Sequence, residues 1–274
     1  MTGPLEGLTA VSIAINLPGP AAMARLVGWG ARGITVLPPT GDPMQHFSPD
    51  YFDELHVGQE LVTADLKTPE GQARLHELLD EADLLVTSSR PSALARLGLD
   101  EESLATRHPR LSRVAIIGHA GDEADVPGHD LTYQASAGLL PDTGLPRTLV
   151  ADLAGAERAA AAGLAAVIGA ARDGRGHYVE VALADAAYSV ARPLHHGLTA
   201  PGSLLGGGLP GYGVYATADG RIALGALEPH LLAATTSALG VEASEAAFEA
   251  TFASQPTSHW LELGAQHGLP IAAG

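Results

Sequence analysis

Asp152 and His129 are the residues whose types and surroundings point most directly to chemistry. Asp152 follows the apolar pair Val150-Ala151 and opens an alanine-rich stretch, so we expect it to be the N-cap of a long helix. A carboxylate there lies near backbone N–H groups that can stabilise a developing oxyanion. Such a carboxylate can attack an acyl group or remove an α-proton, and the alternative is an ordinary structural cap.

His129 belongs to the stretch Pro127-Gly128-His129-Asp130, which we expect to form a loop shortly after a strand. Loops at the carboxyl ends of parallel strands carry the sites of α/β proteins, and a histidine there can shuttle a proton. Asp130 would either orient this imidazole or cap the next helix. The chain has 12 histidines, so His129 carries little weight by itself.

Other candidate residues are less specific. Glu228 lies between Gly225-Ala226-Leu227 and Pro229, where it is either a functional carboxylate or a helix cap. The run Gly206, Gly207 and Gly208 is either a lid or a flexible linker. His195-His196 lacks a third ligand at a recognisable spacing, so no metal site is predicted. No P-loop is present, and no GxGxxG follows the first expected strand.

The elements that would position these residues alternate between strand and helix. Apolar, β-branched runs predict strands at 8–15, 33–37, 83–87, 113–117 and 178–183. Helices are expected at 21–29, after a break at Pro18-Gly19-Pro20, at 69–80 behind a Thr68 N-cap, after Asp100, and at 153–172. This alternation predicts an α/β fold, with a doubly wound, mostly parallel, Rossmann-like domain over residues 1–197.

Composition changes after this domain. Residues 201–213 are rich in Gly and Pro, which predicts a linker or mobile loop. Residues 212–217 and 221–225 predict a hairpin, and a helix is expected after Glu228. We therefore expect a smaller α+β domain over residues 198–274.

The bulk composition excludes several classes of protein. The formal net charge of −16 argues against binding nucleic acid or an anionic membrane. The chain has no cysteine, which excludes disulfides and thiolate chemistry. We find no signal peptide and no uninterrupted apolar run of about 20 residues, so a soluble cytoplasmic protein is expected. Lys67 is the only lysine, so arginines would have to bind any phosphate group.

Several stretches, in order along the chain, resemble the class III CoA-transferases and their relative α-methylacyl-CoA racemase. The resemblance runs from Pro4 to about residue 270. The stretches that carry it are PLEGLTAVSIAINLPGPAAMARL from Pro4, PPTGDPM from Pro38, DLKTPEG from Asp65, RPSALARLGLD from Arg90, PGHDLTYQASAGLL from Pro127, and ADLAGAERAAAAGLAAVIGAARDGRGHYVEVALADA from Ala151.

The resemblance implies that Asp152 is the catalytic carboxylate. The racemases also have a histidine in a GHD…Y loop, matched by His129 and Tyr133, and a GA(I/L)EP segment whose Glu is matched by Glu228. These matches favour the racemase branch. The resemblance to the family also implies a homodimer in which two chains interlock. The remaining residues expected to bind a small acyl thioester are Asn16, Leu17, Pro18, Ser88, Arg90, Arg96, Gly206, Gly207 and Gly208.

The chain also departs from the family pattern. Thr35 and Leu37 replace a basic and an acidic residue, Gly58-Gln59-Glu60 replaces GKR, and Ser88-Ser89 replaces Asn-Phe. These changes remove groups that usually help to hold CoA, and the chain ends at Gly274 without the family's usual C-terminal return segment. No cofactor is expected beyond coenzyme A as part of the substrate.

Three functions follow as hypotheses. The first is a racemase or epimerase that moves the α-proton of a 2-methylacyl-CoA-like thioester between two acid/base groups. The second is a class III CoA-transferase with Asp152 as covalent nucleophile. The third is a repurposed family member that acts on a non-CoA substrate, carrier-bound or a secondary metabolite, or is catalytically silent.

Overall fold

A computed structural model describes residues 3–274, and the chain folds into two compact units with their boundary in the sequence between Ala191 and Arg192. The helix α10 (Arg192–His195) belongs to the second unit, although the sequence assigned it to the large domain. Each unit is described here by itself.

The first unit is built on a six-stranded sheet in the order β3-β2-β1-β4-β5-β6, and every neighbouring pair is parallel. The doubly wound α/β fold expected from the sequence is therefore confirmed. The edge strand β3 was not anticipated, because its residues are largely exposed and polar. The strands are β1 (Thr9–Ser12), β2 (Arg32–Leu37), β3 (Gln59–Thr63), β4 (Leu84–Thr87), β5 (Ser112–Ile117) and β6 (Tyr178–Ala182).

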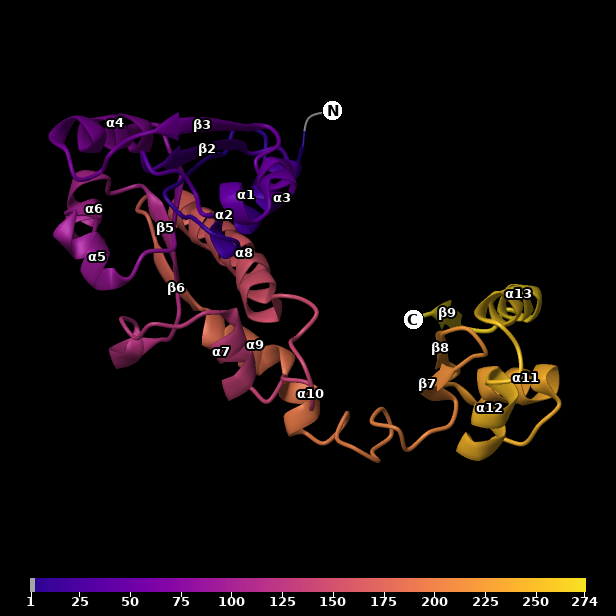
Figure 1. Cartoon of the computed structure of the whole chain (residues 1–274). Helices are drawn as coiled ribbons and strands as arrows, with labels where there is room; N and C mark the ends of the chain where they lie inside the picture. The colour runs from indigo at the N-terminus through magenta and orange to yellow at the C-terminus, as the bar shows by residue number, and fades with distance from the viewer. Residues whose placement is uncertain (1–2) are drawn as a thin grey trace. The chain divides into compact units, whose positions relative to one another are not determined.

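Helices cover both faces of this sheet (Figure 1). One apolar core lies between the sheet and α1, α8 and α9, and a second lies between the sheet and α4, α5 and α6. The helices of this unit are α1 (Pro18–Gly28), α2 (Met44–Phe47), α3 (Pro49–Leu55), α4 (Pro69–Asp80), α5 (Pro91–Arg96), α6 (Glu101–Arg107), α7 (Asp130–Ser136), α8 (Val150–Asp173) and α9 (Leu183–Val190), with a 3₁₀ turn at Gly121–Glu123.

The helix α8 approaches the sheet closely because its buried face consists of Ala and Gly. A Cβ atom at Gly163 would lie 2.7 Å from Leu84 Cδ2, and one at Gly155 would lie 2.2 Å from Leu183 Cδ2. Its 24 residues are long and apolar enough to cross a membrane by length and composition. Its packing against α1, α9 and β5 is that of the central helix of an α/β layer.

The first helix begins earlier than expected. The sequence predicted a break at Pro18-Gly19-Pro20, whereas α1 starts at Pro18. Proline is tolerated in the first turn of a helix, where its missing N–H would have no intrahelical partner. The Thr68 cap was predicted correctly, since its hydroxyl accepts the Gly71 N–H at 3.1 Å.

The second unit contains a three-stranded antiparallel sheet in the order β7-β8-β9. The expected hairpin is confirmed by β7 (Tyr212–Ala216) and β8 (Arg221–Gly225), and the expected helix by α11 (Pro229–Leu239). The strand β9 (Ile271–Ala273) and the helices α12 (Glu245–Phe252) and α13 (Thr257–His267) were not anticipated. An aromatic cluster fills the core of this unit, namely Tyr215, Phe248, Phe252 and Trp260.

His76 in α4 and His108, the residue that follows α6, are both buried and contact each other. The His76 Nδ1 atom lies 2.8 Å from His108 Nε2, and His108 Nδ1 lies 3.2 Å from Asp80 Oδ1. Burial, together with the nearby Arg107 cation, lowers the pKa of both imidazoles, while Asp80 opposes this effect. One nitrogen of the His76–His108 pair must accept a hydrogen bond, so the contact requires at least one neutral ring.

We predict that this pair makes the fold sensitive to acid. The pKa of each imidazole is lower in the folded state than in the unfolded state, so the unfolded chain binds protons more readily as pH falls. The free energy of unfolding should therefore decrease between about pH 7.5 and about pH 5.5. A His76→Gln variant should lose part of this slope in urea unfolding. The exposed His46→Gln variant serves as control, and an equal slope in the wild type and His76→Gln would contradict the assignment.

Candidate functional site

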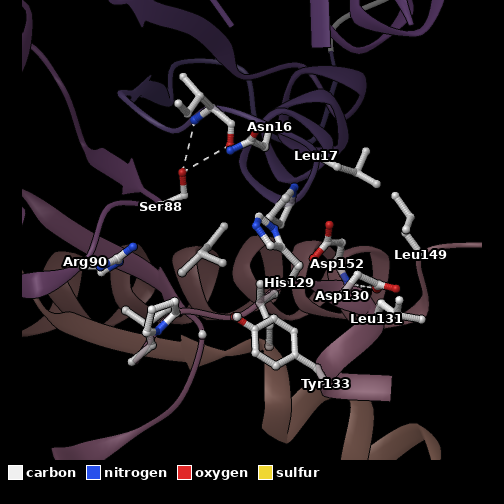
Figure 2. A pocket seen from close by; sticks show the side chains of 18 of the residues that line it. Asn16, Leu17, Ser88, Arg90, His129, Asp130, Leu131, Tyr133, Leu149 and Asp152 are labelled. Carbon is white, nitrogen blue, oxygen red and sulfur yellow. Dashed lines mark hydrogen bonds between the residues drawn. The ribbon is translucent and has the colours of Figure 1, made fainter. Parts of the chain in front are cut away.

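A cavity of about 530 Å³ opens at the carboxyl ends of the parallel strands. Parallel α/β sheets bind ligands at this edge, next to the point where the strand order reverses. Here the reversal lies between β1 and β4. The residues that line the cavity include Ile15, Asn16, Leu17 and Pro18 after β1, Ser88 and Arg90 after β4, Gly118 after β5, Leu183 after β6, and Met44, Phe47, Val126, Gly128, His129, Asp130, Leu131, Tyr133, Leu149 and Asp152 (Figure 2).

Ser88 joins the two strands at the reversal point. Its Oγ atom accepts the N–H of Ile15 at 3.1 Å and donates to the Ile15 carbonyl at 3.3 Å (Figure 2). The side chain that the sequence assigned to substrate binding therefore also holds the ends of β1 and β4 together.

Asn16 adopts an unusual backbone conformation beside this contact. Its φ of 67° lies in the left-handed region, which asparagine tolerates better than most residues. The Asn16 N–H donates to the carboxylate of Asp42 at 3.0 Å, and this buried carboxylate also accepts the Met44 N–H at 2.9 Å. Asp42 thus links the loop after β1 to α2, which brings Met44 and Phe47 to the cavity.

The sequence analysis missed this role of Asp42. The residue precedes a proline in the PPTGDPM stretch, a position that often starts a turn, and this signal could have marked it.

Asp152 is not the N-cap of α8, which corrects the sequence prediction. The helix starts at Val150 with Leu149 at the N-cap, so Asp152 lies within the first turn. The Asp152 N–H donates to Asp130 Oδ1 at 3.0 Å. The sequence analysis expected the N–H groups at the start of this helix to be free to bind an oxyanion. The Asp152 N–H is instead hydrogen-bonded to a carboxylate of another helix.

Asp130 is buried at the start of α7 and connects two segments. Besides accepting from Asp152, its carboxylate accepts from the side-chain amide of Gln134, which also donates to the Thr148 carbonyl at 3.1 Å. The sequence left open whether Asp130 orients His129 or caps the next helix. Its carboxylate caps the first turn of α8.

The carboxyl of Asp152 holds its proton more tightly than an ordinary aspartate. Burial and then the neighbouring charge of Asp130 raise its pKa to about 7. Near neutral pH both its protonated and its ionised forms are present, which is the condition that suits an acid or base catalyst.

His129 occupies the N-cap position of α7, and its exposed side chain lines the same cavity as Asp152. The N–H of His129 donates to the Thr132 hydroxyl at 3.1 Å, which fixes the start of the helix. Figure 2 shows the imidazole and the Asp152 carboxyl among the side chains around this cavity.

Tyr133 lies one turn after His129, and its ring is buried against two glycines. A Cβ atom would come within 2.4 Å of the Tyr133 hydroxyl at Gly118 and within 2.6 Å at Gly128. Burial, and then the charge of Asp152, raises the pKa of Tyr133, so its hydroxyl stays protonated and can donate. The edge-on ring of His119, at a centroid distance of 5.2 Å, completes its surroundings.

The remaining candidates are distributed over both units. Arg90 lines the cavity, and no carboxylate within residues 3–274 lies within ion-pair distance of it. Arg96 is exposed in the last turn of α5 and does not line the cavity. Glu228 precedes α11 in the second unit, and Gly207 and Gly208 line a small hollow there with Leu209 and Pro210.

Within residues 3–274, no three His, Asp or Glu side chains converge on a point where they could hold a metal ion. The chemical groups gathered at the cavity are a carboxyl that titrates near neutrality, an imidazole, a tyrosine hydroxyl and a guanidinium. These groups can exchange protons with a ligand and hold an anionic part of it.

Comparison with known proteins identifies relatives of two kinds, some named as CoA-transferases and others as racemases. The chain is 33% identical to succinate–glutarate CoA-transferase of Agrobacterium fabrum over 66% of this chain and 51% of that protein. It is 30% identical to alpha-methylacyl-CoA racemase of Homo sapiens over 88% of this chain and 66% of that protein. Acetyl-CoA:oxalate CoA-transferase of Acetobacter aceti is 27% identical over 98% and 80%, respectively.

Solved structures share the fold. A hypothetical protein, Rv3272, from Mycobacterium tuberculosis superposes with a TM-score of 0.84 at 25% identity, covering 100% of this chain and 84% of that one. A CAIB/BAIF family protein from Brucella suis superposes with a TM-score of 0.83 at 24% identity. The family model described as CoA-transferase family III matches residues 5–273. The chain therefore belongs to CoA-transferase family III.

Proposed function

We propose that this protein is a racemase or epimerase that moves the α-proton of a 2-methylacyl-CoA-like thioester. The observation that carries the proposal is that a carboxyl with a pKa of about 7 and an imidazole line one cavity. Removing a weakly acidic α-proton needs a base whose pKa lies near the working pH, and returning a proton to the other face needs an acid of similar strength.

In this mechanism His129 and Asp152 exchange roles with the direction of the reaction. One group removes the α-proton, the electrons move onto the thioester oxygen as an enolate, and the other group delivers a proton to the opposite face of the same carbon. The Tyr133 hydroxyl and the first N–H groups of α8 that do not bond to Asp130 are available to stabilise the enolate oxygen. Arg90 would face the anionic part of the coenzyme.

A CoA-transferase is the second candidate, and the names of several relatives favour it. In that reaction the ionised Asp152 would attack the thioester carbonyl, forming an anhydride and releasing CoA thiolate. A pKa of about 7 for Asp152 suits acid/base chemistry, and about half of this carboxyl is ionised at that pH, so the same value is compatible with a nucleophile. Among the described residues, Arg90 is the only arginine or lysine that lines the cavity. Coenzyme A carries several phosphates, so this single cation favours a test of the third hypothesis, a non-CoA substrate.

The proposal also includes an acid/base role for Glu228 and a homodimer. It further includes substrate-binding roles for Arg96, Gly206, Gly207 and Gly208. They rest on the resemblance of these segments to the racemases.

The first prediction concerns α-proton exchange. Asp152→Asn and His129→Gln should each slow incorporation of deuterium from D₂O into a 2-methylacyl-CoA by about 10²–10⁴-fold, because each removes one proton-transfer group. Glu157→Gln, an exposed carboxylate on the same helix, should leave the rate unchanged. Exchange at the wild-type rate in Asp152→Asn would refute the acid/base assignment.

The same preparations separate the racemase from the transferase. A transferase should exchange labelled free CoA into the thioester in the presence of an acceptor acid, and hydroxylamine should inactivate it by trapping the acyl-aspartyl anhydride. A racemase should do neither. Calorimetric titration with CoA tests the third alternative, because a protein repurposed for a non-CoA substrate should show no saturable binding.

The second prediction concerns the pH dependence of exchange. Asp130→Asn removes a negative charge that raises the pKa of Asp152, so that pKa should fall below about 7. Asp152 acts as a base only when ionised, and its ionised fraction decreases as pH falls through its pKa. The acid limb of the pH–rate profile should therefore move to lower pH in Asp130→Asn. A limb that stays in place or moves to higher pH would show that Asp130 does not control this carboxyl.

A further inference from the structure

A second cavity lies in the first unit, among β4, β5, β6, α5 and α6. Its volume is about 230 Å³, and it shares no lining residue with the cavity that contains Asp152. Pockets for drug-sized ligands have volumes of about 300–1,000 Å³, so this cavity fits a molecule smaller than a coenzyme.

Arg113 lies in the wall of this cavity with a donor that has no partner. The residue is 6% exposed, its guanidinium donates to the backbone carbonyl of Glu101, and it lies 5.6 Å from the centroid of the Tyr178 ring. The Nε–H of Arg113 is buried and makes no hydrogen bond. Among the described residues no carboxylate lies within 4.0 Å of this guanidinium, so it is a buried cation without an ion pair.

Thr87 adds a second unsatisfied group to the same wall. It is 5% exposed, and its buried Oγ1 makes no hydrogen bond. Buried polar groups in folded proteins nearly always have a partner, so two unsatisfied groups in one small cavity point to a ligand that supplies an acceptor.

The other charges around the cavity are negative. Asp100, Glu101 and Glu180 line it; the Asp100 carboxylate accepts from Ser103, and Glu180 accepts the Tyr178 hydroxyl at 2.9 Å. A simple anion would be attracted by Arg113 but repelled by these carboxylates. A ligand that carries both an acceptor and a cationic donor satisfies both sets of groups.

The rest of the wall is apolar and comes largely from Leu85, Leu94, Leu99 and Leu104. These side chains suit a short aliphatic group, and they exclude the bulk water that would otherwise solvate Arg113.

We propose that this cavity binds a small zwitterion, an α-amino acid with a short aliphatic side chain. Its carboxylate would accept from Arg113 Nε and Thr87 Oγ1, its ammonium group would donate to Glu101 and Glu180, and its side chain would pack against the leucines. The site is separate from the proton-transfer site and is independent of the function proposed for it.

Calorimetric titration of the full chain with L-valine tests this proposal. Saturable binding is expected, at least about tenfold tighter than binding of isovalerate, which lacks the ammonium group, or isobutylamine, which lacks the carboxylate. If either half binds as tightly as valine, or if valine does not bind, the zwitterion site is refuted.

Variants locate the site. Arg113→Met should abolish valine binding, and Thr87→Val, which nearly preserves shape, should weaken it by about tenfold. Arg110→Met, an exposed arginine nearby, and Asp152→Asn should both bind valine as the wild type does. Circular dichroism checks that each variant is folded. If Arg113→Met is not folded, valine binding by Thr87→Val still tests the proposal. Wild-type binding by Thr87→Val, or loss of binding in Asp152→Asn, would overturn the assignment.

Discussion

The hydrogen bond from the Asp152 N–H to Asp130 is the interaction on which the site depends. Asp130 is buried, and its carboxylate accepts hydrogen bonds from this N–H and from the Gln134 side-chain amide. It therefore joins α7 to the first turn of α8. The positive end of the α8 dipole stabilises its charge. The same charge, added to burial, raises the pKa of Asp152 to about 7. One carboxylate is thereby used for structure, and the other has a pKa near neutrality.

The cavity around this pair exists because the sheet reverses its winding between β1 and β4. The connections leave these strands in opposite directions, and Ser88 and Asp42 close the gap through hydrogen bonds to Ile15 and Asn16. Small residues also shape the cavity, because Gly118 and Gly128 leave room for the ring of Tyr133. The site is therefore a consequence of topology and of missing side chains as much as of the reactive groups.

The two cavities of the first unit differ in their electrostatics. At the strand ends, Asp152 is partly protonated and partly ionised near neutral pH, and Arg90 is the cation in the wall. On the face covered by α5 and α6, Arg113 is buried among leucines with Glu101 and Glu180 nearby. In a chain of net charge −16, Arg90 and Arg113 thus each line one of these cavities. In the second unit, packing instead comes from tilted and edge-on aromatic rings.

The sequence alone determined the features that depend on local pattern, namely the alternation of strands and helices, the Thr68 cap and the hairpin. It also indicated the family and identified Asp152 and His129 as candidate catalytic residues. It placed the start of α8 incorrectly, because it assumed that the helix would be capped by its own aspartate, whereas Asp130, 22 residues away, accepts the N–H. Asp42 bonds across 26 residues to Asn16, and Arg113 and Thr87 line one cavity because their strands are neighbours in the sheet. Local pattern records the energetic preferences of adjacent residues, and only the tertiary structure decides which distant groups share a bond or a cavity.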